Sequence, residues 1–461
     1  MEKNFDLVVI GAGPAGYVAA IRAAQLGMKV ACVEKDKTLG GTCLNVGCIP
    51  SKALLESSEI YARTAKELGD HGIQVNGLSL DLQRFMGRKD QVVKRLTGGV
   101  AMLFKKNKIE PVLGAAQIHQ DKTVVVGDAK LSAKNIILAT GSVSANLPGF
   151  DVDNERIVDS TGALSLQQIP KKMIVIGGGY IGLEMGSVYS RLGSEVLVLE
   201  ALDRIVPMMD LELGQAFQKI LERQGIQFRL SASVKKGEVH GDSVEVTFET
   251  EGKEGKITVD VVLVAVGRKP YTGGLGLKEA GIETDAKGFI AIDEKFQTTL
   301  SGVYAVGDCV RGPMLAHKAS EEGIAVVESL AGQAGHVNYQ AIPAIVYTWP
   351  EVASVGMTEE EAKAKGIDYK AFKFPFLANG RALAMGYRDG FVKLIADKKT
   401  DRLLGAHILG PRASDMIAEM VLAIEFSASA EDIARTCHAH PTLSEAVKEA
   451  ALGLGSGTIH I

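Results

Sequence analysis

Short apolar runs followed by glycine-rich turns recur along this chain of 461 residues. The first run, Leu7–Ile10, is strand-like; a helical segment at Tyr17–Leu26 and a second strand-like run at Lys29–Val33 follow it. The turn between the first strand and the helix contains three glycines, Gly11, Gly13 and Gly16. Such a turn admits a pyrophosphate to the unpaired N–H groups of a helix N-terminus. Glu34, directly after the second strand-like run, can accept a hydrogen bond from a ribose hydroxyl, so the pattern predicts a dinucleotide-binding unit.

The same pattern recurs in the middle of the chain. Met173–Ile176 is strand-like, and Val196–Leu199 is a second strand that ends at Glu200. The glycines of this second turn are Gly177, Gly179 and Gly182, and the interval from the last of them to the acid equals that from Gly16 to Glu34. Two copies predict two nucleotides. A carboxylate at Glu200 suits a free ribose 2′-hydroxyl and repels a 2′-phosphate, which favours NAD over NADP.

The connections predict that the second unit is inserted into the first. Ile136–Leu138 leads into Thr140 and Gly141, and Val261–Val266 leads into Gly267; these two crossings are typical of a chain that leaves a domain and returns to it. Val303–Val306 is a further strand of the first unit. The predicted fold class is α/β, with two Rossmann-like domains, the second inserted in the first, and a C-terminal α+β domain.

The C-terminal part, from about Ala341, has no glycine unit. It alternates strand-like and helical segments, which predicts a sheet packed against helices. The strand-like runs are Ala344–Tyr347, Phe391–Ile395 and Leu403–Ile408, and the helical segments are Ser414–Phe426 and Ser444–Ala451.

Composition narrows the class of protein. The chain is 46% hydrophobic and 23% charged with a formal net charge of −4, and its basic residues are dispersed, so no nucleic-acid partner is expected. The longest apolar runs are far shorter than the roughly 20 residues that span a bilayer, so no membrane partner is expected. The first strand begins within a few residues of the N-terminus, which predicts a cytoplasmic protein without a targeting segment.

Two cysteines, Cys43 and Cys48, lie in the segment Gly40–Cys48 directly after the first nucleotide unit. The pair is redox-active, metal-bound or inert. Zinc needs two further ligands at matching spacing, and none is nearby, so no metal is expected. Thiols near a helix N-terminus gain thiolate character, and Ser51–Leu68 is predicted to be helical. The remaining cysteines, which are interpreted as inert packing residues, are Cys32, Cys309 and Cys437.

The segment Leu39–Lys52, with Glu34 before it, resembles the active-site signature of the flavoprotein disulfide reductases. Its ending, Ile49–Lys52, is most similar to the branch of that family that oxidises dihydrolipoyl groups. The resemblance implies FAD in the first unit and NAD in the second. It also implies that Cys43 exchanges with a dithiol substrate, that Cys48 touches the flavin as a thiolate, and that Lys52 lies beside the flavin ring.

The resemblance implies further contacts. Asp308 would bind the ribityl chain of the flavin, and Glu184 would face the nicotinamide and the lysine on the flavin side. The other positions that the resemblance implies for cofactor binding, besides the two glycine turns and their acids, are Gly41, Thr42, Ala116, Thr140, Gly141, Met314, Leu315, Ala316, His317, Val234 and Gly267.

Two histidines near the C-terminus, His438 and His440, compete for the role of proton carrier. Pro441 favours an extended backbone at His440. The resemblance selects His440 as the base and Glu445 as the acid that orients it. Thr442 to Glu445 also reads as a capping box, so a purely structural role for Glu445 stays open.

The resemblance covers nearly the whole chain and implies an NAD-dependent oxidation of dihydrolipoyl groups. It implies a homodimer whose substrate carrier is the lipoyl-bearing acyltransferase of a 2-oxo acid dehydrogenase complex or the lipoyl carrier protein of the glycine cleavage system. The predicted domains are 1–147 and 269–340 for FAD, 148–268 for NAD and 341–461 for dimerisation. Glutathione-type and mercuric reductases share the cysteine segment; Glu200 argues against the former, and the absence of a cysteine pair in Gly457–Ile461 against the latter. A non-enzymatic flavin-bound redox sensor is a further alternative, and it would need neither His440 nor a complete second nucleotide site.

Overall fold

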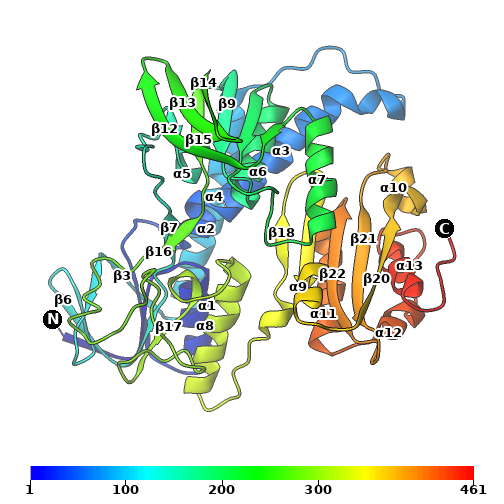
Figure 1. Cartoon of the computed structure of the whole chain (residues 1–461). Helices are drawn as coiled ribbons and strands as arrows, with labels where there is room; N and C mark the ends of the chain where they lie inside the picture. The colour runs from blue at the N-terminus through cyan, green and yellow to red at the C-terminus, as the bar shows by residue number, and fades with distance from the viewer. Residues whose placement is uncertain (1) are drawn as a thin grey trace. The chain divides into compact units, whose positions relative to one another are not determined.

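The computed structural model describes residues 2–461, which fall into two compact units (Figure 1). The first unit comprises the chain up to Ala53 together with Gln83–Ala145 and Gly267–Val337. The second comprises Leu54–Leu82, Asn146–Val266 and Asn338–Ile461. Residues 54–82 therefore group with the second unit, whereas the sequence assigned them to the first nucleotide domain. The boundaries of the four sequence-derived domains stay predictions.

A seven-stranded sheet forms the centre of the first unit, in the order β3-β2-β1-β6-β5-β4 with β17 beside β6. The strands are β1 (Glu2–Ile10), β2 (Val30–Glu34), β3 (Glu110–Leu113), β4 (Ala116–Ile118), β5 (Thr123–Val126), β6 (Ala129–Leu138) and β17 (Val303–Ala305). β1 pairs in parallel with β2 and β6, and β17 pairs in parallel with β6. Val8 and Ile10 of β1 enter one core while Leu7 and Val9 enter another, so both faces of the sheet are buried.

Helices α1 (Pro14–Gln25) and α8 (Ala316–Leu330) lie side by side in the first unit (Figure 1). Their approach is close: a Cβ on Gly323 would lie 2.7 Å from the carbonyl oxygen of Ala15. Alanines at 19, 20 and 23 of α1 form a buried face with Val326 and Val327 of α8. The helices between β2 and β3 are α2 (Gly41–Val46), α3 (Cys48–Lys66), the 3-10 turn η1 (Leu68–His71) and α4 (Leu82–Lys106).

A two-stranded ribbon marks the point where the chain leaves the first unit and returns to it. β7 (Ser142–Ser144) pairs antiparallel with β16 (Arg268–Pro270), and the N–H of Ala145 donates to the carbonyl oxygen of Gly267 over 3.0 Å. The two crossings that the sequence identified thus lie side by side. The predicted insertion of one nucleotide-binding fold into the other is confirmed.

The inserted part contains a parallel sheet in the order β11-β10-β9-β15-β8 and an antiparallel sheet β12-β13-β14. Buried residues of both sheets, such as Ile174 of β9 and Val246 of β13, share one core. The strands are β8 (Ile157–Val158), β9 (Lys172–Ile176), β10 (Glu195–Leu199), β11 (Gln227–Arg229), β12 (Ala232–His240), β13 (Ser243–Thr250), β14 (Lys253–Val259) and β15 (Val261–Val264). The helices are α5 (Ser160–Ala163), α6 (Tyr180–Arg191) and α7 (Leu211–Arg223).

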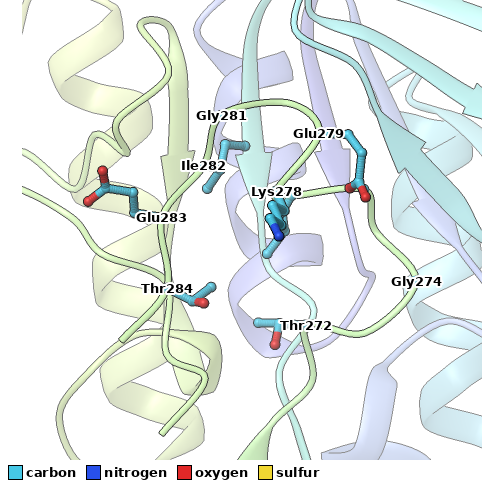
Figure 2. Close-up of a pocket in the computed structure, with 10 residues that line it drawn as sticks. Thr272, Gly274, Lys278, Glu279, Gly281, Ile282, Glu283 and Thr284 are labelled. Carbon is cyan, nitrogen blue, oxygen red and sulfur yellow. The ribbon is translucent and has the colours of Figure 1, made fainter. Parts of the chain in front are cut away.

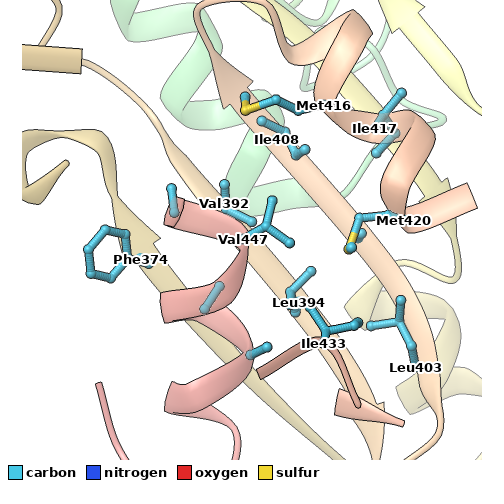
Figure 3. Close-up of a cluster of buried hydrophobic side chains, with 14 of the residues drawn as sticks. Phe374, Val392, Leu394, Leu403, Ile408, Met416, Ile417, Met420, Ile433 and Val447 are labelled. Atoms are coloured by element: carbon cyan, nitrogen blue, oxygen red, sulfur yellow. The ribbon is translucent and has the colours of Figure 1, made fainter. Parts of the chain in front are cut away.

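The C-terminal part is a five-stranded antiparallel sheet, β18-β19-β22-β21-β20, packed against helices. Figure 3 shows its core, in which Val392 and Leu394 of the sheet meet Met420 and Val447 of the helices. The strands are β18 (Ala344–Val346), β19 (Glu351–Gly356), β20 (Tyr369–Pro375), β21 (Phe391–Asp397) and β22 (Leu403–Gly410). The helices are α9 (Glu359–Ala364), α10 (Gly380–Ala384), α11 (Ala413–Glu425), α12 (Ala430–Arg435) and α13 (Glu445–Gly453).

Among the helices of residues 2–461, none combines the length and the apolar character that crossing a membrane requires.

Candidate functional site

The first glycine turn joins β1 to α1 and contains two positions that only glycine fits. A Cβ on Gly11, whose φ is +101°, would lie 2.3 Å from the carbonyl oxygen of Ala139. A Cβ on Gly16 would lie 1.8 Å from the carbonyl oxygen of Gly11. Around Gly13, by contrast, the nearest atom to such a Cβ is the Cα of Gly41 at 3.8 Å. The turn is therefore tight where strand and helix pack and open where a pyrophosphate would lie.

Glu34, at the end of β2, holds this turn in place. Its Oε2 accepts the N–H of Ala12 over 2.9 Å, and its Oε1 accepts the N–H of Asp36 over 3.0 Å. An ionised carboxylate has about four acceptor positions, so these two bonds leave capacity for a ribose hydroxyl. The sequence identified the acid but gave no sign of its backbone contacts.

The second glycine turn, between β9 and α6, repeats this geometry. A Cβ on Gly177 would lie 2.5 Å from the carbonyl oxygen of Ala265, and one on Gly182 would lie 2.3 Å from that of Gly177. Around Gly179 no atom lies within 4 Å of such a Cβ. Both units thus contain the cradle that a dinucleotide pyrophosphate requires.

Glu200, at the end of the second unit's strand β10, occupies the position that Glu34 has in the first. Its Oε2 accepts the N–H of Gly178 over 2.5 Å, and its Oε1 accepts the N–H of Leu202 over 2.8 Å. The side chain is almost fully buried. Both acids therefore bind the residue that follows the first glycine of their turn, and both keep acceptor capacity for a ribose.

The cysteine segment is helical and is joined to the first glycine turn. The N–H of Gly40 donates to the carbonyl oxygen of Ala12 over 2.8 Å. Gly41, with φ +57°, approaches the turn so closely that a Cβ would lie 2.5 Å from the Cα of Gly13. Thr42 and Cys43 follow within α2. The backbone thus places the first cysteine beside the expected pyrophosphate site.

The second cysteine, Cys48, is the first residue of α3. The sequence predicted that this helix begins at Ser51, which is too late, since Pro50 lies within the first turn of the helix. Proline is tolerated in that turn, where its missing N–H would have no helical partner. The break between α2 and α3 lies instead at Gly47, where a Cβ would lie 2.8 Å from the carbonyl oxygen of Thr42.

The two thiols interact with each other. The Cys43 side chain is hydrogen-bonded to that of Cys48. This hydrogen bond, and then burial, raises the pKa of the Cys43 thiol, while the positive charge of Lys52 opposes the rise. Cys48 also has the helix N-terminus behind it, which favours a thiolate. The structure thus gathers both thiols and the charge of Lys52 at the junction of α2 and α3.

Tyr17 is a neighbour of the thiols that the sequence did not single out. Burial, and then the negative charge of Cys43 and Cys48, raises the pKa of its phenol. Its place in the first turn of α1, directly after Gly16, was the signal that could have found it.

Asp308 lies in the 3-10 turn η2 (Gly307–Cys309) after β17. Its Oδ2 accepts the hydroxyl of Ser142 over 2.6 Å, and the Nε of Arg268 donates to the same hydroxyl over 2.7 Å. Thr140 lies just before the ribbon strand β7, and its hydroxyl donates to the carbonyl oxygen of Tyr271 over 2.6 Å. One carboxylate oxygen of Asp308 is thus oriented by the protein, and Oδ1 remains for a ligand hydroxyl.

The other positions implied for cofactor binding are distributed over several elements. Leu315 is the N-cap of α8, Ala316 and His317 lie in its first turn, and Met314 precedes it. Gly141 and Gly267 flank the ribbon β7–β16. Ala116 is buried at the start of β4, and Val234 lies in β12 beside a register irregularity. These roles stay predictions.

Glu184 of α6 is buried, with 2% of its surface exposed. Its Oε1 accepts the N–H of Tyr347, next to β18, over 3.0 Å. The nucleotide-binding helix is thus bonded to the C-terminal part within the second unit. The predicted role beside the nicotinamide stays a prediction.

His440 and Glu445 form a hydrogen-bonded pair. The His440 Nδ1 lies 2.9 Å from the Glu445 Oε1, and the Glu445 Oε2 accepts the N–H of Thr442 over 2.8 Å. Burial raises the pKa of Glu445, but the bonds from Thr442 and His440 outweigh it and lower the pKa. The Thr442 hydroxyl donates to Ala439, so only the glutamate half of the capping box forms. Glu445 therefore orients the histidine and also holds the loop before α13.

His438 has a glutamate partner that the sequence did not reveal. Its Nε2 lies 2.8 Å from the Glu419 Oε1 and its Nδ1 lies 3.0 Å from the carbonyl oxygen of Thr436. The Glu419 contact raises the pKa of His438. Its side chain is 6% exposed, against 80% for that of His440. Both of its nitrogens are occupied, whereas His440 keeps Nε2 available for a proton.

Two other features lie apart from these residues in the chain. A cavity of about 590 Å³ runs along the loop from Thr272 to Thr284, and no predicted site residue lines it (Figure 2). Glu238, His240 and Glu245 are close enough together to ligate a metal. Each of the two glutamates already pairs with a lysine over 2.7 Å, so these charges have partners within the hairpin.

Two family descriptions match the chain. Residues 5–323 match Pyridine nucleotide-disulphide oxidoreductase, and residues 342–451 match the dimerisation domain of that group. The predicted resemblance, fold class and FAD–NAD cofactor pair are confirmed. The match to a dimerisation domain also supports the predicted homodimer.

Similar proteins cover nearly the whole chain. Dihydrolipoyl dehydrogenase, mitochondrial, of Pisum sativum is 52% identical over 99% of this chain and 92% of its own length. Leghemoglobin reductase of Vigna unguiculata is 53% identical over 97% of this chain and 87% of its own. The crystal structure of LpdA from Mycobacterium tuberculosis has a TM-score of 0.90 at 25% identity, covering 97% of this chain and 99% of that one.

The prediction of a cytoplasmic location is wrong. The pea relative and others from Arabidopsis thaliana and Schizosaccharomyces pombe are named mitochondrial enzymes. The strand pattern of a folded domain is the same whether or not a cleavable targeting segment is made with it. A strand close to the first residue therefore carries no information about the compartment.

The matched residues include both glycine turns, the cysteine segment and the histidine–glutamate pair. The chain belongs to the pyridine nucleotide-disulphide oxidoreductase family, whose members are FAD-dependent disulfide oxidoreductases that use NAD.

Proposed function

We propose that this chain is a dihydrolipoyl dehydrogenase, which oxidises protein-bound dihydrolipoyl groups and reduces NAD⁺. The observation that carries the proposal is the hydrogen-bonded pair Cys43–Cys48, bound through Gly40 and Gly41 to a dinucleotide turn. A dithiol in that position can receive electrons from a substrate dithiol and deliver them to a nucleotide cofactor. The names of the full-length relatives from pea and Chaetomium thermophilum support the same substrate class.

The sulfur chemistry begins with Cys43 and Cys48 joined as a disulfide. A substrate thiolate attacks the Sγ of Cys43, the bond to Cys48 breaks, and Cys48 leaves as a thiolate. The second substrate thiol then attacks the mixed disulfide, which releases the lipoyl disulfide and a reduced Cys43. The substrate has lost two electrons and two protons, and the cysteine pair holds the electrons.

His440 removes protons from the substrate thiols at Nε2 while Glu445 holds its Nδ1. The carboxylate fixes the ring orientation and stabilises the charged imidazolium. Lys52, whose charge acts on the cysteine pair, favours the thiolate form. FAD, when bound, would supply the two-electron link between this dithiol and NAD⁺, and the overall products would be a lipoyl group, NADH and a proton.

Each nucleotide has a defined set of holders in this chain. Gly11, Gly13, Gly16 and Glu34 would hold the ADP part of FAD, and Asp308 its ribityl chain. The second turn and Glu200 would hold NAD. His440 of one protomer would serve Cys43 of its partner in the homodimer. The lipoyl group would come from a separate chain, either an acyltransferase of a 2-oxo acid dehydrogenase complex or the lipoyl carrier of the glycine cleavage system.

Steady-state kinetics test the proposal. NAD⁺-dependent oxidation of dihydrolipoamide should exceed NADPH-dependent reduction of glutathione disulfide by at least about a hundredfold in kcat/KM. The reason is that Glu200 in the second nucleotide site selects NAD, and that His440, oriented by Glu445, removes protons from a substrate dithiol. Comparable efficiency with glutathione disulfide would contradict the proposal.

The cofactor preference should depend on Glu200. Replacing Glu200 with Ala removes a charge-assisted hydrogen bond to the ribose. The change should weaken the binding of NAD⁺ by about 1.5–3 kcal/mol, which raises its KM roughly 10- to 150-fold. Glu200→Gln keeps an acceptor but removes the charge that repels a 2′-phosphate. It should therefore raise kcat/KM for NADP⁺ with a smaller loss for NAD⁺.

Glu195 is the matched control, because it lies on the same strand with an exposed side chain. Glu195→Gln should leave kcat/KM for NAD⁺ and for NADP⁺ unchanged. Equal efficiency of the unmodified enzyme with NAD⁺ and NADP⁺ would refute the role given to Glu200.

A further inference from the structure

Two fully buried charged residues lie beneath the Gly307–Cys309 turn. Lys318 and Glu322 are four residues apart on α8, and neither side chain is exposed. The Lys318 Nζ lies 3.1 Å from the Glu322 Oε1. A lysine and a glutamate four apart on a helix usually form a surface pair, so their complete burial calls for an explanation.

Both side chains bind the same residue of the turn. The Lys318 Nζ donates to the carbonyl oxygen of Gly307 over 3.0 Å. The Glu322 Oε2 accepts the N–H of Gly307 over 2.7 Å. Gly307 has φ +81°, a conformation that glycine adopts readily. The two ends of the ion pair thus fix both backbone polar groups of one residue.

The next residue is Asp308, whose Oδ2 accepts the hydroxyl of Ser142, and that hydroxyl in turn accepts the Nε–H of Arg268. We propose that Lys318 and Glu322 are positioning residues for FAD: they fix the backbone of Gly307 and thereby the direction in which Asp308 presents Oδ1. The inference rests on the proposed function through the assignment of Asp308 to the ribityl chain.

Stability alone accounts poorly for this pair. A buried ion pair is often no more stable than apolar residues of similar volume, because both charges lose their hydration. Here the pair also binds both backbone groups of Gly307, and the N–H of that residue has its acceptor in Glu322. A positioning role predicts that FAD affinity depends on the pair through Asp308, over and above any loss of folding stability.

The test measures the dissociation constant of FAD, by quenching of flavin fluorescence, on apoprotein made from the full-length chain. Glu322→Gln keeps the size of the side chain and removes its charge. This variant should raise the dissociation constant of FAD about tenfold to a hundredfold, and so should Asp308→Asn. The double variant should bind FAD within about threefold of Asp308→Asn alone, because the two residues act on one contact.

Lys393 provides the control, since it is 3% exposed and forms a buried ion pair with Asp210 over 3.0 Å in the second unit. Lys393→Met should lower the melting temperature of the apoprotein and leave the FAD dissociation constant within about twofold. Should Glu322→Gln fail to fold, Glu322→Asp, which keeps the charge but shortens the reach, carries the same comparison.

Three results would overturn the inference. One is a Glu322 variant that melts earlier but binds FAD as tightly as the unmodified chain. Another is a double variant whose fold-increase in the FAD dissociation constant equals the product of the increases in the two single variants. The third is an Asp308→Asn variant with unchanged FAD affinity. Failure of the dihydrolipoyl assignment would appear in substrate kinetics and would leave these FAD titrations unchanged.

Discussion

Replacing Cys48 with serine should abolish oxidation of dihydrolipoamide, with a loss in kcat on the order of 10⁴-fold. A serine hydroxyl can neither form the disulfide with Cys43 nor ionise near neutral pH. The nucleotide turns do not depend on this sulfur, so the variant should still bind FAD and NAD⁺. Stopped-flow and steady-state assays with dihydrolipoamide measure the loss.

The two cysteines should also differ in their visible spectra. A thiolate in contact with oxidised flavin gives a long-wavelength absorption band, and we assign that thiolate to Cys48. Cys43→Ser should therefore show the band without reduction, and Cys48→Ser should lack it throughout an anaerobic titration. The exposed Cys437 is the control, because Cys437→Ser should behave like the unmodified enzyme. A band in Cys48→Ser would reverse the assignment of the two sulfurs.

Replacing His440 with glutamine should lower kcat by about 10²- to 10⁴-fold, the usual contribution of a general base. Glutamine can still accept a hydrogen bond but cannot carry a proton. His438→Gln is the matched control, because His438 has both nitrogens bonded within its own chain. The His438→Gln variant should lower kcat by less than about tenfold.

The same variant tests whether the site is shared between protomers. When Cys43→Ser and His440→Gln chains are refolded together, about half of the dimers should be mixed. If His440 serves the partner's Cys43, each mixed dimer contains one site with both defects and one with neither. About a quarter of unmodified activity should then return. If both residues came from one chain, every site would carry a defect, and activity would stay at the level of the parental variants despite mixed dimers confirmed by mass.

The nucleotide units could be predicted from sequence because their constraints are local. Gly16 must be glycine since its neighbour in space, the Gly11 carbonyl, is also close to it in the chain. The spacing from the last glycine to Glu34 or Glu200 follows from one helix and one strand. These two steps use contacts within a single strand–helix–strand segment, whereas the close approach of Gly11 to Ala139 depends on a distant strand.

The remaining features depend on contacts between distant segments. Glu419 meets His438 from a neighbouring helix, α11, and no pattern in the chain links them. Lys318 and Glu322 have the spacing of a solvated helix pair, and only the packing of α8 under Gly307 buries them. The start of α3 was predicted at Ser51 and lies at Cys48, because a first helical turn tolerates Pro50 and the residues before it carry no pattern that marks the start.

The ribbon β7–β16 also has a consequence for the order of events during translation. The last strand of the host sheet, β17, pairs with β6, so that Val303 must find Ile136 after the whole insertion has been made. The inserted parallel sheet needs only residues up to Val264, since β15 is the last of its strands to be synthesised. At about 5–20 residues per second, the interval between β6 and β17 lasts on the order of 10–30 s. The inserted sheet can therefore form while the edge of β6 at Ile136–Leu138 has no strand beside it, which leaves that edge open to pairing with another chain until β17 is made.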